Sequence, residues 1–226
     1  MKKSCFAIWI GILAMCAVFF AGCGAVSESG KDEEWHTYST RFEEINMVTC
    51  PTFSFDYPEN WSITAEEYDG QTNSLAGEYV VLSNGGNAEI TFIRWSTSHI
   101  GGYGRTMYRY QVSKVSDSSF EPGRPAGTNT DLSGLGDFMV AKIETTGFMF
   151  LDTDSEYRTV EESYRYAVLP ESRIGEYEAR GLAGFYETFW VEYAGPFSII
   201  AAGKDAPLTE KETEEVIKIL ASFRVE

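Results

Sequence analysis

Three acidic residues are spaced as the ligands of a calcium ion would be. Asp152, Asp154 and Glu156 occupy positions one, three and five of the segment DTDSE, which is how a calcium-binding loop begins. Such a loop continues with glycine at position six and glutamate at position twelve, where this chain has Tyr157 and Ser163. We therefore interpret the segment as an acidic turn between two strands. A calcium-stabilised structural module is the alternative hypothesis.

Other metal and phosphate sites are not indicated by the spacing of residues. The two histidines, His36 and His99, lie far apart, and Cys50 lies alone between them, whereas a zinc site needs several ligands at characteristic spacings. The glycines of segments 101–104 and 134–136 lack the following Lys-Ser/Thr pair of a phosphate-binding loop. The sequence thus predicts no cofactor and no transition-metal centre.

Hydrolytic chemistry also finds little support in the motifs. No G-x-S-x-G sequence occurs, and two histidines leave few general bases. Adjacent carboxylates such as Glu66-Glu67 and Glu161-Glu162 are common in so acidic a chain, but neighbours in a strand point to opposite faces. A carboxylate-based envelope hydrolase would need two acids brought together in a pocket by the fold.

A late group of aromatic residues is a candidate binding surface. In a strand over residues 185–193, alternation places Tyr186 and Trp190 on one face. Phe185 and Phe189 then lie on the opposite face. Helices on both faces of the sheet would bury both sets in a core. One open face would instead leave Tyr186 and Trp190 as an aromatic surface for a protein or glycan.

The N-terminus has the pattern of an export signal. Two lysines precede an apolar run over residues 6–21, which is shorter than the roughly 20 residues that span a bilayer. The FAGC sequence that ends at Cys23 resembles a bacterial lipobox, in which the thiol is acylated and the chain is cut just before it. Residues 1–22 are therefore predicted to be a lipoprotein signal peptide and Cys23 the lipidation site. An ordinary secretory signal, with Cys23 incidental, is the alternative.

The anchor and the charge of the chain define its expected surroundings. Two acyl chains suffice for stable attachment, so we expect a protein on the extracytoplasmic face of the cell membrane, joined to it by the N-terminal lipid. The chain has 18 Lys and Arg against 34 Asp and Glu, a formal net charge of −16 at pH 7. Nucleic acid is not an expected partner, because such a surface repels phosphate backbones. Only Cys50 remains outside the signal and the anchor, so no intramolecular disulfide is expected.

The rest of the chain divides into a tether and one domain. Residues 23–35 comprise the acylated cysteine and a polar, acidic stretch without periodicity, which predicts a flexible tether. Residues 36–226 contain no internal repeat and no second linker. A domain of this size buries roughly 70% of its unfolded surface, which is enough for a core without disulfides.

Alternating apolar residues predict that this domain is rich in antiparallel strands. Segment 52–63 is interpreted as a short hairpin with a turn at Pro58-Glu59-Asn60, and segment 78–95 as a second hairpin with an Asn-Gly-Gly turn. Further strands are predicted in segments 138–152 and 157–170. Segment 185–203 is expected to form two strands joined at Ala194-Gly195-Pro196.

Two segments have helical periodicity. Segment 209–223 opens with a capping box, in which the Thr209 hydroxyl accepts from the amide of Glu212 and the Glu212 carboxylate reaches back. Its apolar residues then fall on one stripe. Segment 105–115 has roughly helical spacing too, but Tyr110 and Gln111 leave a strand as the alternative.

The ends of the domain carry a resemblance. The FSFDYPENW segment, the intervening strands and the terminal helix ending in ILASFR resemble the PsbP-like proteins, which include extrinsic photosystem subunits, a Ran-binding nuclear import factor and bacterial lipoproteins of unknown function. The resemblance covers residues 52–224 and implies an α+β fold, an antiparallel β-sheet flanked by helices in an α/β/α sandwich. The matching residues are core and turn residues, namely Phe53, Phe55, Pro58, Trp61, Ser222 and Phe223. The resemblance therefore implies a fold and no shared chemistry.

These observations favour a lipid-anchored binding or interaction protein of the cell envelope without catalytic activity. Its expected partners are the membrane, through the lipid, and an envelope protein. The carboxylate hydrolase and the calcium-stabilised module remain as alternatives.

Overall fold

The computed structural model describes most of the predicted domain. It covers residues 34–42, 44–45, 48–69, 77–95, 103–123, 132–193 and 195–226, and these belong to one compact unit, Glu33–Glu226. The predicted signal peptide, the lipidation site Cys23 and residues 24–33 of the predicted tether lie outside the described residues, as does His99. Trp35, predicted as the last tether residue, begins the first strand. Within the described part of the chain, no helix is long and apolar enough to cross a membrane.

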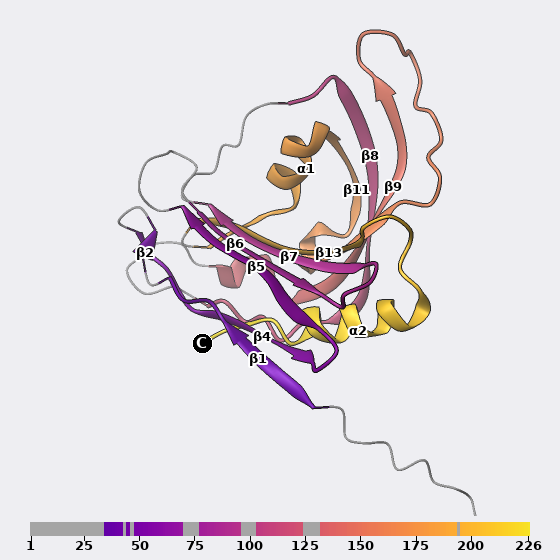
Figure 1. Cartoon of the computed structure of the whole chain (residues 1–226). Coiled ribbons are helices and arrows are strands. Elements are labelled where there is room, and N and C mark those ends of the chain that lie inside the picture. Colours follow the sequence, from indigo (N-terminus) through magenta and orange to yellow (C-terminus); the bar gives the residue numbers. More distant parts are fainter. Residues whose placement is uncertain are drawn as a thin grey trace, which may run out of the picture. The chain divides into compact units, whose positions relative to one another are not determined.

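A large antiparallel sheet forms the centre of this unit (Figure 1). Its strands follow the order β11-β8-β9-β10-β13-β7-β6-β5, and β12 pairs with β13 outside this path. The strands are β5 (Ser62–Asp69), β6 (Gly77–Ser83), β7 (Ala88–Trp95), β8 (Thr106–Asp117), β9 (Phe138–Phe150), β10 (Tyr164–Pro170), β11 (Gly175–Arg180), β12 (Val191–Glu192) and β13 (Pro196–Gly203). The predicted β6–β7 hairpin is confirmed, and so are the strands β9 and β10, which pair with each other. The fold is thus α+β and mostly antiparallel sheet.

A second, three-stranded sheet joins the two ends of the described chain. β4 (Phe53–Pro58) lies between β1 (Trp35–Ser39) and the C-terminal β14 (Arg224–Val225). A short pair, β2 (Glu44–Ile45) with β3 (Val48–Thr49), precedes it. The hairpin predicted over segment 52–63 is therefore wrong in its pairing: the turn forms, with the amide of Trp61 donating to the Pro58 carbonyl, but it leads from one sheet to another. Both edges of β4 are already occupied, so β5 pairs with β6 instead.

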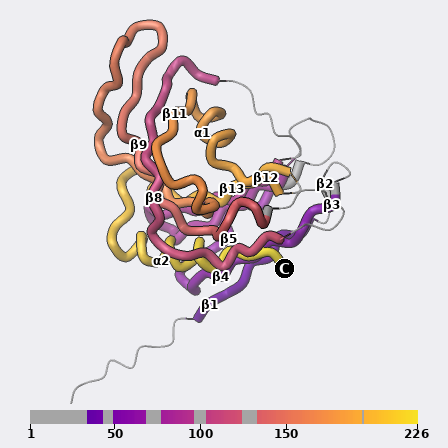
Figure 2. The backbone as a smooth tube through the Cα atoms, turned by 180° about the vertical axis from the view of Figure 1, so that it is seen from behind, coloured from indigo at the N-terminus to yellow at the C-terminus, as the bar shows by residue number. Residues whose placement is uncertain are grey.

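The central sheet is buried on both faces. In β9, Val140 belongs to one core, while its neighbours Met139 and Ala141 belong to the other. The first core also contains the apolar side of α2 (Glu210–Ala221) and β4, and the second contains α1 (Gly181–Phe189). Figures 1 and 2 show the two helices on opposite sides of the central sheet. A sheet covered on both faces explains the long apolar runs in its central strands.

The C-terminal helix forms as its sequence predicts. Thr209 is the N-cap of α2, its hydroxyl accepts from the Glu212 amide, and the Glu212 carboxylate accepts from the Thr209 amide at 2.9 Å. Val216 and Leu220 are fully buried on the side that faces the sheet. The capping box therefore fixes where the helix begins, and the apolar stripe fixes which side is buried.

Two other predictions about helices and strands are corrected by the structure. In segment 185–203 the first predicted strand is wrong for residues 185–189, which belong to the helix α1, but Val191–Glu192 form the strand β12, which pairs antiparallel with the long second strand β13 as predicted. The members of each aromatic pair, Phe185 with Phe189 and Tyr186 with Trp190, are four residues apart. A spacing of four places two residues on the same side of a strand and also on the same side of a helix, so this pattern fits both. Segment 105–115 is not a helix but belongs to β8, which is the alternative that Tyr110 and Gln111 left open.

Candidate functional site

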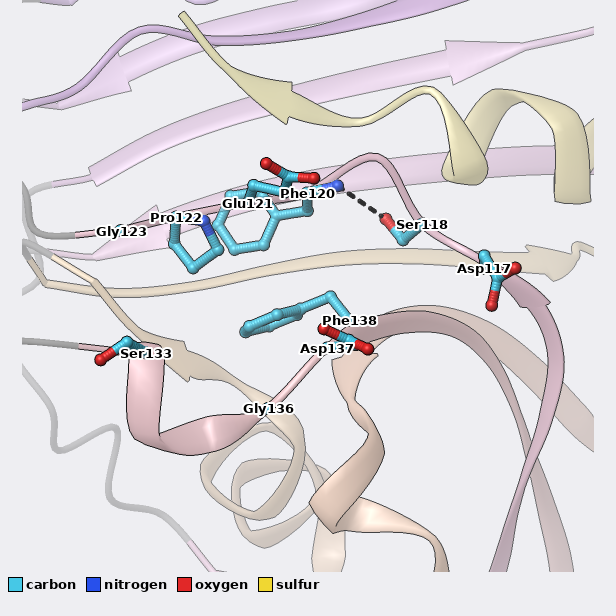
Figure 3. Close-up of a pocket in the computed structure, with 10 residues that line it drawn as sticks. All are labelled: Asp117, Ser118, Phe120, Glu121, Pro122, Gly123, Ser133, Gly136, Asp137 and Phe138. Carbon is cyan, nitrogen blue, oxygen red and sulfur yellow. Dashed lines mark hydrogen bonds between the residues drawn. The ribbon is translucent and has the colours of Figure 1, made fainter.

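An acidic cavity of about 560 Å³ lies beyond the end of β8, where the chain leaves the central sheet. Figure 3 shows the rings of Phe120 and Phe138 next to each other among the residues that line it, and their centroids are 4.8 Å apart. Its carboxylates, Asp117, Glu121 and Asp137, are all exposed, and no hydrogen bond joins any two of them in the described structure. Exposed, solvated carboxylates lack the burial that tunes one of a pair into a general acid. The cavity therefore gives the carboxylate-hydrolase alternative no specific support.

A second cavity, of about 270 Å³, lies between α1 and the sheet, and we call it the α1 cavity. Strand β8 contributes two tyrosines, β9 a threonine, the segment 160–165 a serine and an arginine, and α1 its first turn and one phenylalanine. The lining includes the side chains of Tyr108, Tyr110, Thr145, Ser163, Arg165, Leu182 and Phe185. The cavity thus combines aromatic walls with several hydroxyl groups and one cation, as small-molecule sites do.

Local sequence features explain how the walls of the α1 cavity are placed. Tyr108 and Tyr110 are two residues apart in a strand and therefore share a face of β8. The ring of Tyr110 lies edge-on to Phe185, with centroids 5.4 Å apart. The β8–β9 register shifts between Arg109 and Tyr110, so that Tyr110 lies opposite Thr145. Irregularities of this kind re-aim side chains, and here one lies beside a cavity.

The start of α1 depends on a glycine. Gly181 has φ of +62°, and a Cβ at this position would lie 2.8 Å from the amide nitrogen of Gly104. Arg180, the residue before the helix, donates from Nε to the Gly104 carbonyl at 2.7 Å. The close approach of the two backbones therefore sets where Leu182 and Phe185 enter the α1 cavity.

Arg165 is the only cation that lines the described walls of the α1 cavity. Its side chain is half-buried, and its guanidinium lies 5.0 Å from the centre of the Phe185 ring. No carboxylate in the described residues forms an ion pair with it. Burial raises the pKa of Tyr110 to about 12, while the charge of Arg165 acts in the opposite direction. The positive charge of Arg165 therefore acts on the aromatic lining of the cavity, Tyr110 included.

The structure places the predicted aromatic surface beside the α1 cavity and not within its lining. Tyr186 and Trp190 are half-buried and both pack against Trp95 at the end of β7, with ring centroids 5.4 and 6.0 Å away, respectively. Phe185 and Phe189 are fully buried on the side facing β8. The four aromatic residues thus lie on two sides, in the two pairs that their spacing predicts, although the element that carries them is a helix and not a strand. A binding role for Tyr186 and Trp190 stays a prediction.

The structure pairs two of the three proposed calcium ligands, Asp152 and Asp154, with arginines, and leaves Glu156 exposed. Asp152 accepts from Nη1 of Arg105 at 2.9 Å. Asp154 accepts from Arg158 and, through its other oxygen, from the Phe150 amide, and these hydrogen bonds lower the pKa of Asp154. Among the described residues there is no group of three acidic, histidine or cysteine side chains that could hold a metal ion.

A buried arginine and a buried glutamate lie next to each other elsewhere, beneath β4, and sequence reasoning missed them. Arg94 donates from Nη2 to the Pro51 carbonyl at 2.8 Å and lies 4.4 Å from the centre of the Phe53 ring. Its partner Glu78 is fully buried too. The signal was present in the sequence, because Arg94 follows Ile90 and Phe92 at the spacing of one strand face.

Comparison with known proteins adds no assignment. No family model matches the chain, and neither does any curated protein or solved structure.

Proposed function

We propose that this protein is a lipid-anchored binding protein of the cell envelope, without catalytic activity. Acylated Cys23 holds it at the extracytoplasmic face of the membrane, and a PsbP-like α/β/α sandwich carries the binding site. The single observation that carries the binding role is the α1 cavity, which has aromatic walls and a half-buried arginine without a carboxylate partner in the described residues.

The sandwich is supported by the arrangement of the two helices. α1 and α2 pack on opposite faces of the central sheet. The residues on which the resemblance rests lie where a structural role requires them: Phe53, Phe55 and Phe223 are fully buried, and Trp61 is buried at the turn after β4.

The membrane placement is supported by the N-terminal sequence. The apolar run over residues 6–21 is too short for a membrane-spanning helix and ends at small residues before Cys23. Lipid attachment would leave the α1 cavity available to ligands outside the cytoplasm.

One experiment tests the placement. We would label cells expressing the tagged full chain with a palmitate analogue and separate the membranes from the soluble fraction. We expect label and membrane association for the natural chain and loss of both in Cys23→Ala. Cys50→Ala, which removes a buried thiol of the folded domain, is the matched control and should behave as the natural chain. Unlabelled protein, or label retained in Cys23→Ala, would contradict the proposal.

A second experiment tests the binding role at the cavity. The detergent-solubilised lipoprotein is analysed by native mass spectrometry, beside the variant Ser163→Phe, whose larger side chain fills the α1 cavity. A small molecule that accompanies the natural chain and is absent from Ser163→Phe supports the role. The same molecule on both forms would place binding elsewhere.

A further inference from the structure

We infer that the α1 cavity binds a small organic carboxylate with an aromatic or branched apolar body. In this inference, which rests on the proposed binding function, the carboxylate pairs with Arg165 and the apolar body lies against Tyr108 and Phe185. The charge, the walls and the size of the cavity all favour such a ligand.

The charge of Arg165 is available to a ligand, whereas most arginines of this acidic protein are paired with carboxylates. Six other arginines in the described residues have a carboxylate partner: Arg41, Arg94, Arg105, Arg109, Arg158 and Arg224. Arg165, Arg173 and Arg180 lack one there, although the whole chain has 34 Asp and Glu, and of these three only Arg165 lines the α1 cavity. Its guanidinium contacts the ring of Phe185 instead. A half-buried guanidinium retains its charge, so an anion from outside is the missing partner.

The kind of anion follows from the number of donors. A guanidinium presents two parallel N–H groups that match the two oxygens of a carboxylate. Phosphate dianions generally recruit further cations, and no lysine or second arginine lines this cavity. The hydroxyl groups of Tyr110, Thr145 and Ser163 are neutral hydrogen-bonding groups that suit a singly charged ligand.

The walls indicate that the rest of the ligand is apolar. The rings of Tyr108, Tyr110 and Phe185 line the cavity; Tyr108 is half-buried, Tyr110 and Phe185 are buried behind it, and Leu182 is 64% exposed at the first turn of α1. An exposed leucine beside a cavity gains stability when an apolar group covers it. The volume of about 270 Å³ lies just below the usual range of ligand sites, which fits a small aromatic or branched acid and not a long lipid.

The test uses phenylacetate as the probe and isothermal titration calorimetry with the full lipoprotein in detergent. Benzoate and 3-methylbutanoate extend the acid series, while phenylacetamide is the neutral analogue and phenyl phosphate the dianionic one. We expect the acids to bind and the amide to bind about tenfold more weakly or not at all, because it forms no charge-assisted pair.

Variants assign the effect to Arg165. Arg165→Gln should weaken phenylacetate binding about tenfold or more. Arg165→Lys keeps the charge but loses the two parallel N–H donors, so its affinity should lie between those of the natural chain and Arg165→Gln. Arg173→Gln, a change of another arginine outside the cavity lining, is the matched control and should bind as the natural chain does. Thermal unfolding of each variant shows that the domain remains folded.

The outcomes separate this inference from the function on which it rests. If phenylacetamide or phenyl phosphate binds as tightly as phenylacetate and Ser163→Phe abolishes that binding, the cavity is a binding site but the carboxylate class is wrong. Equal phenylacetate affinity in Arg165→Gln also overturns the inference. If no probe binds the natural chain and no small molecule accompanies it in native mass spectrometry, both the inference and the binding function fail.

Discussion

Nη1 of Arg94 lies 3.9 Å from Oε2 of Glu78, and both side chains are fully buried between the two sheets. Neither carboxylate oxygen of Glu78 has a close hydrogen bond in the described structure. Burial therefore raises the pKa of Glu78 to about 7, although the charge of Arg94 opposes the shift. A pair that is this poorly solvated contributes to stability in a way that depends on pH.

The free energy of unfolding should fall as the pH rises from about 4.5 to 7. Folded Glu78 retains its proton in this range while the unfolded chain, with the ordinary pKa of 4.5, releases it. The stabilisation is complete below about pH 4.5 and is lost as the pH passes 7; its size is about 3 kcal/mol. Urea denaturation at several pH values measures this contribution.

Glu78→Gln should remove that part of the pH dependence, because the amide does not titrate. Glu67→Gln, which changes an exposed glutamate on β5, is the control and should keep the pH profile of the natural chain. A profile that is unchanged in Glu78→Gln would show that the group does not titrate in this range.

Thr209→Ala should destabilise the domain by about 1 kcal/mol, because it removes the hydroxyl that accepts from the Glu212 amide. Urea denaturation measures the loss. Glu214→Ala, on the exposed side of α2, keeps the cap and should change the stability much less. Equal effects of the two changes would mean that the cap contributes nothing specific.

The features that the sequence predicts correctly are local ones. Alternation and an Asn-Gly-Gly turn define the β6–β7 hairpin, and the Thr209–Glu212 capping box defines the start of α2. The pairing of β4 was missed because its partners come from the two ends of the described chain. α1 was missed because the spacing of Phe185 and Phe189 fits both periodicities.

The α1 cavity was not predictable for a similar reason. Its lining comes from β8, β9, the 160–165 segment and α1, which no local pattern connects. The segment that contains Tyr108 and Tyr110 has roughly helical spacing, which hides the strand face that the two tyrosines share. Arg165 alternates with Tyr164 and Tyr166 and carries no motif. Only the fold shows that it lacks the carboxylate partner that most other arginines have.

Gly181→Ala should destabilise the domain and weaken ligand binding in the α1 cavity. The residue has φ of +62°, and the new Cβ would lie 2.8 Å from the Gly104 amide nitrogen, so the helix or its neighbour has to move. Gly85→Ala is the control, since Gly85 has φ of +74° with no atom near its Cβ.

Strain at a positive φ alone costs roughly 1–2 kcal/mol. Denaturation should therefore show a loss of that size for Gly85→Ala and a larger one for Gly181→Ala. Losses of equal size would show that the contact with Gly104 adds nothing. Phenylacetate titration should detect weaker binding only for Gly181→Ala, because only this glycine positions α1.

Calcium at millimolar concentration should neither produce binding heat nor raise the melting temperature. An ion at the 152–156 turn would have to replace the pairing of Asp152 with Arg105 and that of Asp154 with Arg158. A site with fewer than the usual six to eight oxygen ligands does not offset that loss. Calorimetry and thermal unfolding with calcium and with a chelator measure both quantities.

The double change Arg105→Gln with Arg158→Gln is the informative comparison, because it frees both carboxylates. Calcium stabilisation of the natural chain would restore the calcium-module hypothesis, whereas stabilisation of the double variant alone would show that the arginines occupy the position of the cation.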